Sequence, residues 1–226
     1  MFQLLQRWLL PYHCILCHQA SDQQLDLCAD CQTTLPFLGH CCQQCAMPLP
    51  SGQRCGACLK HPPSFNRTFA LFRYESPINQ WITQLKFHRN LRNARLLSEL
   101  FLEKYNQIER PDIIIPIPLH PRRMRQRGFN QAVELARPLA KHFHTTLDKH
   151  RCKRIRYTPA QSSIPAKQRR QNLKQAFAYR GLIPQHVAIV DDVITTGHTV
   201  NELSKLLRQA GCQQIDVWAI ARTARY

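Results

Sequence analysis

Cysteine is unevenly distributed along this chain of 226 residues. Nine of the eleven cysteines lie between Cys14 and Cys58, and eight of these nine form four Cys-x2-Cys pairs. The last two pairs follow the first two at offsets of 28, 28, 27 and 27 residues, so one cysteine unit occurs twice. A segment this short has too few apolar residues to form its own hydrophobic core. Something other than apolar packing must therefore stabilise its fold. The paired cysteines are Cys14, Cys17, Cys28, Cys31, Cys42, Cys45, Cys55 and Cys58.

Zinc is the expected substitute for that core. Each unit supplies four thiolates, and each Cys-x2-Cys pair can occupy two corners of a zinc tetrahedron. A disulfide framework is the alternative, but it requires an oxidising compartment. Two questions stay open at this point. The four pairs can bind two zinc ions sequentially or in an interleaved order, and Cys41 can replace Cys42 because a three-residue spacing to Cys45 is also permitted.

After Pro62 and Pro63 the pattern becomes that of an α/β protein. Apolar strand-like runs alternate with amphipathic helical segments, which predicts a mostly parallel sheet with helices on both faces. We therefore expect a small zinc-ribbon-like module over residues 1–62 and an α/β domain over residues 63–226. The expected strands are 68–75, 112–118, 145–158, 186–190 and 214–224, and the expected helices are 76–105 (one or two), 128–143 and 199–211, with a basic helix or loop at 166–177.

The N-terminus and the hydropathy predict a cytoplasmic protein. No run of eighteen apolar residues occurs, so we expect no membrane span. The first residues are apolar in patches but include Arg7 and lack a small-residue cleavage site. We expect a short helix there that packs Leu5, Trp8 and Leu9 on the body of the protein.

Most of the formal net charge of +17 is concentrated in one third of the chain. Residues 1–60 hold three basic and three acidic side chains, whereas residues 120–180 hold sixteen Lys or Arg and only two acids. Such a segment is typical of a protein that binds a polyanion or a phosphate-bearing ligand. The alternative is a solvated basic surface with no ligand.

The stretch "VAIVDDVITTGHTV", residues 187–200, is the clearest candidate site. An apolar strand is expected to end at Val190, with Asp191 and Asp192 at its tip, and a loop of threonines and one glycine leads into the next helix. Ligands of parallel sheets bind where the strands end, and a helix N-terminus favours a phosphate. Carboxylates accept paired hydrogen bonds from vicinal hydroxyls, so the stretch suits a ribose 5-phosphate.

This stretch resembles the phosphoribosyl pyrophosphate (PRPP) motif of type I phosphoribosyltransferases. Other segments, "QLKFHRN", "IIPIPLHPRRMRQRGFNQAVELA" and "TPAQSSIPAKQRRQN", are similar to signatures of the ComF family of competence proteins. That family joins a cysteine-rich zinc module to a phosphoribosyltransferase domain, and the resemblance covers residues 8–222. His198 departs from the motif, because small residues are usual at that position.

The resemblance implies a role for each matching residue. Asp191 and Asp192 would hold the ribose hydroxyls, and magnesium would be held mainly by PRPP itself. Pro116 would belong to the loop near the pyrophosphate. Gln161 would belong to the mobile loop that closes over the site in active enzymes. The 5-phosphate would be bound by Thr195, Thr196, Gly197 and Thr199, and the pyrophosphate would lie near Pro118 and His120. DNA would contact Arg122, Arg123, Arg125, Arg127, Arg169 and Arg170, although Arg123, Arg125 and Arg127 could be merely solvated.

Two function classes follow from the resemblance. The first is a competence protein that binds PRPP and single-stranded DNA, supports natural transformation and contacts other competence or DNA-uptake proteins. The second is an active phosphoribosyltransferase for a small base or amine, with the zinc module as a hood over the acceptor. A transcription regulator is a weaker third class, since no helix-turn-helix pattern stands out. The basic third of the chain favours the first class.

Overall fold

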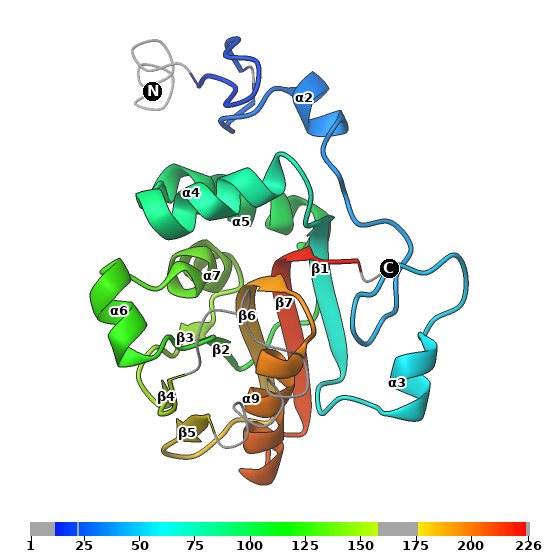
Figure 1. Ribbon diagram of the computed structural model, residues 1–226, viewed down its shortest axis with the longest axis vertical. Coiled ribbons are helices and arrows are strands. Elements are labelled where there is room, and N and C mark those ends of the chain that lie inside the picture. The colour runs from blue at the N-terminus through cyan, green and yellow to red at the C-terminus, as the bar shows by residue number, and fades with distance from the viewer. Residues whose placement is uncertain (1–11, 22, 158–175, 225–226) are drawn as a thin grey trace.

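The protein is described by a computed structural model that covers residues 12–21, 23–157 and 176–224. Its centre is a five-stranded, wholly parallel sheet with the strand order β1-β7-β6-β2-β3 (Figure 1). The strands are β1 (Arg67–Arg73), β2 (Ile113–Pro116), β3 (Thr146–Leu147), β6 (His186–Ile194) and β7 (Gln214–Arg222). The expected N-terminal helix around Leu5, Trp8 and Leu9 lies outside the described residues.

Helices cover both faces of the sheet, as the sequence predicts (Figure 1). Along β6, Ala188 and Val190 belong to one hydrophobic cluster, and Val187 and Ile189 belong to the other. This alternation follows from the two-residue period of a strand, and it explains why the run "VAIV" is apolar throughout. One face packs α4 (Ile78–His88), α5 (Leu91–Tyr105) and α7 (Gln131–His142), and the other packs α9 (His198–Gln209).

The structure differs from the sequence-based expectation in its shorter elements. The basic segment after β2 forms a helix, α6 (Pro121–Arg127), with Pro121 at its first position. The strand expected over residues 145–158 is two strands, because β3 ends at Leu147 and β4 (Cys152–Arg154) pairs antiparallel with β5 (Phe177–Tyr179) outside the main sheet. The prediction that the central strand ends at Val190 is wrong, since β6 runs through both aspartates to Ile194.

The cysteine repeat is also a structural repeat. Turn residues His18 and Ala46 stand 28 positions apart and adopt positive φ angles of 62° and 55°. Each unit ends in a one-turn helix, α2 (Ala29–Thr33) or α3 (Gly56–Lys60). We call residues 12–34 the first zinc ribbon and residues 41–61 the second zinc ribbon. The first lies above α4 and α5 in Figure 1, and the second lies beside β1 and near the C-terminus.

In the part of the chain that the structure describes, no helix is both long and apolar enough to cross a bilayer. The longest described helix is α5, with 15 residues, and it packs against the sheet through Leu96, Leu97 and Leu100.

Candidate PRPP site and zinc centres

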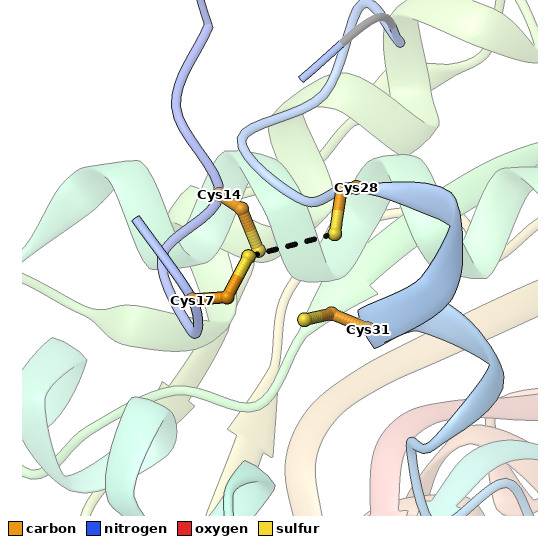
Figure 2. A group of neighbouring side chains, drawn as sticks. All are labelled: Cys14, Cys17, Cys28 and Cys31. Atoms are coloured by element: carbon orange, nitrogen blue, oxygen red, sulfur yellow. Dashed lines mark hydrogen bonds between the residues drawn. The ribbon is translucent and has the colours of Figure 1, made fainter. Parts of the chain in front are cut away.

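Two groups of four cysteines are arranged to hold one metal ion each. Within each group all four sulfur atoms lie within 4.8 Å of one another. Sulfur atoms that bond one zinc at about 2.3 Å in a tetrahedron are separated by about 3.8 Å. The Sγ atoms of Cys17 and Cys28 are 3.7 Å apart, and those of Cys45 and Cys55 are 3.6 Å apart (Figure 2 shows the first group). These separations fit a shared zinc ion, and they are far longer than the ~2.05 Å of a disulfide.

The geometry resolves both questions that the cysteine spacing left open. The pairs combine sequentially, so one group is Cys14, Cys17, Cys28 and Cys31, and the other is Cys42, Cys45, Cys55 and Cys58. Cys41 stands outside the second group. It forms an isolated β-bridge with Pro48, as His13 does with Ala20 in the first ribbon, so Cys41 is the repeat counterpart of His13.

The thiol of Cys42 is also prepared to bind a metal. Burial raises the pKa of Cys42, but N–H groups of Cys55, Cys45 and Gln44 outweigh burial and lower this pKa to about 7. The N–H of Cys55 lies 3.3 Å from the Cys42 sulfur. Zinc binds the thiolate, and these backbone donors stabilise the thiolate of Cys42, in agreement with its place in the four-cysteine group.

A pocket lies where β6 ends and α9 begins. Gly197 has a φ of 75° and directly precedes α9, so the loop turns in a conformation that glycine adopts without strain. The Thr196 hydroxyl accepts a hydrogen bond from the N–H of His198 at 3.3 Å. The pocket is lined by Asp191, Val193, Ile194, Thr195, Thr196, Gly197, His198, Thr199 and Val200. A helix N-terminus and adjacent hydroxyls at one pocket can bind a phosphate group.

The two adjacent aspartates have different surroundings. Asp191 lines the pocket, and one of its carboxylate oxygens accepts the Asp192 N–H at 2.9 Å. Asp192 is only 4% exposed and points to the other side of β6, where its Oδ1 accepts a hydrogen bond from Gln131 Nε2 at 3.0 Å. Its Oδ2 forms an ion pair with the Lys86 ammonium. Asp191 therefore faces the pocket, whereas Asp192 is held from behind by protein groups.

These surroundings shift the two carboxyl groups in opposite directions. Burial and the neighbouring charge of Asp192 raise the pKa of Asp191 well above its usual value. Burial also raises the pKa of Asp192, but the Lys86 charge and the Gln131 hydrogen bond outweigh it, so this pKa lies below its usual value. Asp192 is thus the stable anion of the pair, and Asp191 gains most from a ligand that donates hydrogen bonds.

Lys86 is a site residue that the sequence reasoning did not single out. It lies in the last turn of α4, inside the segment "QLKFHRN", and its position beside Asp192 depends on the packing of α4 over the sheet. Burial lowers the pKa of Lys86, but the two aspartates outweigh burial and raise it. Only the family signature pointed to this segment, because Lys86 is far from the aspartates in the sequence.

The arginines of α6 do not share one environment. Arg127 donates from Nη1 to Gln131 Oε1, and its guanidinium stacks over the ring of Phe87 at 5.5 Å. Arg127 is therefore part of the network behind Asp192. Arg123 lies one helical turn before Arg127 and is half-buried on the same side, whereas Arg125 is exposed. Because the segment is a helix, the three arginines differ in exposure, and their predicted contact with DNA stays a prediction.

His120 and Arg122 are held at the start of α6. The His120 ring accepts the N–H of Arg122 at 3.2 Å and thereby caps the helix. The ring of Tyr157 lies 5.2 Å from the His120 ring and 5.0 Å from the Arg122 guanidinium. Pro118 follows β2, directly after Ile117, whose N–H bonds Val190 O at 2.9 Å. Neither Pro118 nor His120 is among the residues that line the pocket.

Several predicted contact residues cannot be placed. Arg169, Arg170 and Gln161 lie outside the described residues, so their predicted roles stay predictions.

Comparison with known proteins agrees with the two parts of the structure. Residues 5–59 match the model of the double zinc ribbon domain, and residues 87–225 match that of the phosphoribosyl transferase domain. Competence protein F of Haemophilus influenzae is 36% identical over 93% of this chain and 97% of its own. DNA utilization protein YhgH of Escherichia coli O157:H7 is 37% identical over 87% of this chain and 90% of its own. Competence protein ComFC of Streptococcus pneumoniae is 26% identical over 87% of both chains.

Three findings indicate the same family: the four-cysteine sites, the pocket at the end of β6, and the sequence identity along nearly the whole chain. The chain belongs to the ComF family of competence proteins, in which a double zinc ribbon precedes a phosphoribosyltransferase domain.

Proposed function

We propose that this protein binds PRPP at the pocket between β6 and α9, and binds single-stranded DNA on the basic surface that includes α6. The observation that carries the proposal is that one pocket is lined by Asp191 and by every threonine and glycine of the phosphate motif. A ribose 5-phosphate presents two vicinal hydroxyls and one phosphate, which match a carboxylate and a helix N-terminus. We further propose a cytoplasmic location, where zinc thiolates stay reduced.

In this proposal, different residues bind different parts of PRPP. Thr195, Thr196, Gly197 and Thr199 hold the 5-phosphate. Asp191 accepts one ribose hydroxyl in the pocket. Asp192, which Lys86 keeps ionised, accepts the other once its carboxylate turns from Gln131 toward the pocket. Magnesium, held mainly by oxygens of PRPP, neutralises the pyrophosphate. The segment from Pro118 to His120 is the proposed contact of the pyrophosphate.

Single-stranded DNA binding is supported by charge and by exposed aromatic groups. Arg122 and Arg125 are exposed on α6, and the ring of Tyr157 beside Arg122 is 41% exposed. Guanidinium groups neutralise phosphates, and an exposed ring can stack on a base without regard to sequence. Relatives are named for competence and for DNA utilization. We therefore propose a role in handling incoming DNA during natural transformation, together with other competence or DNA-uptake proteins.

Calorimetry with PRPP and magnesium tests the first part of the proposal. Replacing Asp191 and Asp192 by alanine should weaken PRPP binding by about 100-fold or more, because each lost charge-assisted bond is worth about 1.5–3 kcal/mol. Asp112→Ala is the matched control, since Asp112 accepts the His186 N–H at 2.9 Å at the opposite end of the sheet. Unchanged PRPP affinity in the double variant would contradict the proposed site.

An assay of pyrophosphate release, with protein, PRPP and magnesium, decides between the two function classes. With DNA or with small bases and amines present, an active phosphoribosyltransferase releases pyrophosphate, whereas a PRPP-binding competence protein does not. Release of pyrophosphate that is abolished in Asp191→Ala would establish the enzymatic alternative.

A salt titration tests DNA binding. The logarithm of the affinity should fall with the logarithm of the salt concentration, with a slope of about −0.7 per phosphate contacted. Arg125→Glu should flatten this slope, whereas Lys60→Glu, the same charge change on the exposed helix α3 of the second zinc ribbon, should not. If both variants bind DNA as the wild type does, the basic segment is only a solvated surface.

A further inference from the structure

Arg222 is a buried arginine that contacts two parts of the molecule at once. It is the last residue of β7 and is only 3% exposed. Its Nε donates to the carbonyl of Cys45 at 2.9 Å, and its Nη1 donates to the carbonyls of Ile194, at 3.1 Å, and Thr195. Cys45 is a ligand in the second four-cysteine site, and Thr195 lines the candidate phosphate pocket. One guanidinium therefore joins the second zinc ribbon to the phosphate loop.

On the pocket side, Arg222 fixes the direction of the loop's peptide groups. The N–H and C=O of a trans peptide point in opposite directions. When the carbonyls of Ile194 and Thr195 face Arg222, the N–H groups of Thr195 and Thr196 face away from it. Arg222 itself is not among the residues that line the pocket. Thr223 supports the same arrangement, since its N–H donates to Ile194 O at 3.1 Å and its hydroxyl donates to Thr195 O at 3.3 Å.

On the zinc side, the Cys42-x2-Cys45 turn is fixed against the sheet. The N–H of Thr68 in β1 donates to Gln43 O at 3.0 Å, and the Thr68 hydroxyl donates to Gln44 O at 2.7 Å. Ala46 is fully buried in the same hydrophobic cluster as Ile194. The position of the Cys45 carbonyl therefore depends on the zinc-bound turn and on β1 together.

The position of the buried Arg222 guanidinium depends on the groups that accept its hydrogen bonds. Arginine has only donors, and a buried cation is stable only while acceptors surround it. The acceptors of Arg222 include the Cys45 carbonyl of the second zinc ribbon, the Ile194 and Thr195 carbonyls of the phosphate loop, and the carbonyl of its neighbour Thr223 at 3.0 Å. If the second site loses zinc, the Cys45 carbonyl keeps only the support of β1, so its hydrogen bond with Arg222 weakens and Arg222 shifts toward the loop carbonyls that remain.

We propose that Arg222 is a positioning residue that couples occupancy of the second zinc site to ligand affinity at the phosphate loop. The inference rests on the proposed function for the identity of the ligand, PRPP, but the coupling concerns the two sites themselves. Such coupling is reciprocal: if zinc raises the affinity for PRPP by some factor, PRPP raises the affinity for zinc by the same factor.

The test compares Arg222→Met, Arg222→Lys and the wild type, all loaded with zinc. Arg208→Met is the matched control, because Arg208 also bridges segments, from α9 to the carbonyls of Ser64 (3.0 Å) and Cys212 (3.1 Å), at the other end of α9. Two quantities are measured: the PRPP affinity by calorimetry with magnesium, and the rate at which zinc passes to a fluorescent chelator with and without PRPP.

In the wild type, PRPP should slow the loss of one of the two zinc ions and leave the other unchanged. Arg222→Met should abolish this difference and weaken PRPP binding about tenfold, a typical size for coupling between sites. Arg222→Lys keeps a charge and some donors, so it should restore part of both effects. Arg208→Met should keep both, even if its unfolding temperature falls, which separates positioning from stability.

Hydrogen exchange at residues 194–199 distinguishes failure of the coupling from failure of the proposed function. The coupling predicts faster exchange there when zinc is removed from the wild type, and equally fast exchange in zinc-loaded Arg222→Met. The inference is overturned if Arg222→Met matches the wild type in hydrogen exchange, zinc release and PRPP affinity. If Arg222→Met does not fold, the same comparison is made with Arg222→Lys. If the wild type does not bind PRPP, the proposed function fails, and the exchange result alone decides the coupling.

Discussion

The first and second zinc ribbons share their internal geometry but are attached to the rest of the protein in different ways. In each, the N–H of the first cysteine donates at 2.8 Å to the residue five positions later, Cys14 to Gln19 and Cys42 to Met47. The described hydrogen bonds from the first ribbon to the phosphoribosyltransferase domain go to α5, where Arg92 pairs with Asp26 and is 48% exposed. The second ribbon is held by buried groups of β1 and β7.

This contrast shows that a repeated fold does not imply a repeated role. Exposed ion pairs contribute about 0–1 kcal/mol each, because water and salt screen them and long side chains lose entropy. Buried hydrogen bonds to a charged group contribute about 1.5–3 kcal/mol each. The polar contacts of the first ribbon are thus weak surface contacts, while its buried Leu25 and Leu27 join the hydrophobic cluster of α4 and α5. The second is built into the edge of the domain that carries the pocket.

Removing both zinc ions should give the largest effect. Structural zinc in small modules contributes about 10–16 kcal/mol of apparent binding free energy, which is also folding free energy. We expect about two zinc per chain by metal analysis. We also expect chelation to remove hydrogen-exchange protection from residues 12–60 while β2, β6 and β7 keep theirs. Reduced, freshly purified protein without zinc would contradict both four-cysteine sites.

Disrupting one site at a time should separate the two ribbons. Cys42→Ser should weaken PRPP binding about tenfold, because the Cys45 carbonyl loses the support of the zinc site and Arg222 shifts, whereas Cys14→Ser should change it by less than about twofold. Each variant should retain one zinc, which metal analysis verifies before calorimetry. Equal losses of PRPP affinity would show that the ribbons are attached equivalently.

Much of this arrangement could be predicted from the sequence, because it follows from local patterns. Cysteine spacing indicated the four-cysteine units, and apolar runs indicated β1, β2, β6 and β7. The choice between Cys41 and Cys42 was also encoded, since the 28-residue offset aligns Cys41 with His13 rather than with Cys14.

The rest depends on contacts between distant residues. Lys86 meets Asp192, and Arg222 meets Cys45, only after α4 and the zinc ribbon pack on the sheet. No local pattern marks such pairs. Helix α6 was missed for another reason: its sequence, "PRRMRQR", has no apolar face, so its helical start depends on Pro121 and on the His120 cap.

Removing one buried hydroxyl, that of Thr68, should moderately lower the free energy of unfolding at the attachment of the second ribbon. Thr68→Val keeps the shape of the side chain but removes the donor to Gln44 O, so a buried carbonyl loses a partner at a cost of about 1–3 kcal/mol. Thr83→Val is the matched control, because Thr83 makes the same 2.7 Å bond to a carbonyl on the exposed surface of α4. Denaturant unfolding measures both. Equal destabilisation of the two variants would mean that burial at β1 adds nothing to the attachment.

The smallest effect is expected at the surface contact of the first ribbon. Arg92→Ala removes the 2.6 Å ion pair with Asp26 and the 2.9 Å bond to His13 O, but both partners remain accessible to water. The free energy of unfolding should fall by no more than about 1 kcal/mol. The difference from the wild type should shrink in 1 M salt, where the screening length is about 3 Å. Arg137→Ala, which removes the 3.1 Å pair with Glu134 within α7, controls for the loss of an exposed helical arginine away from the ribbon. PRPP affinity should be unchanged in both variants. A loss above about 2 kcal/mol in Arg92→Ala, beyond the range for exposed pairs, would mean that the first ribbon is anchored as firmly as the second.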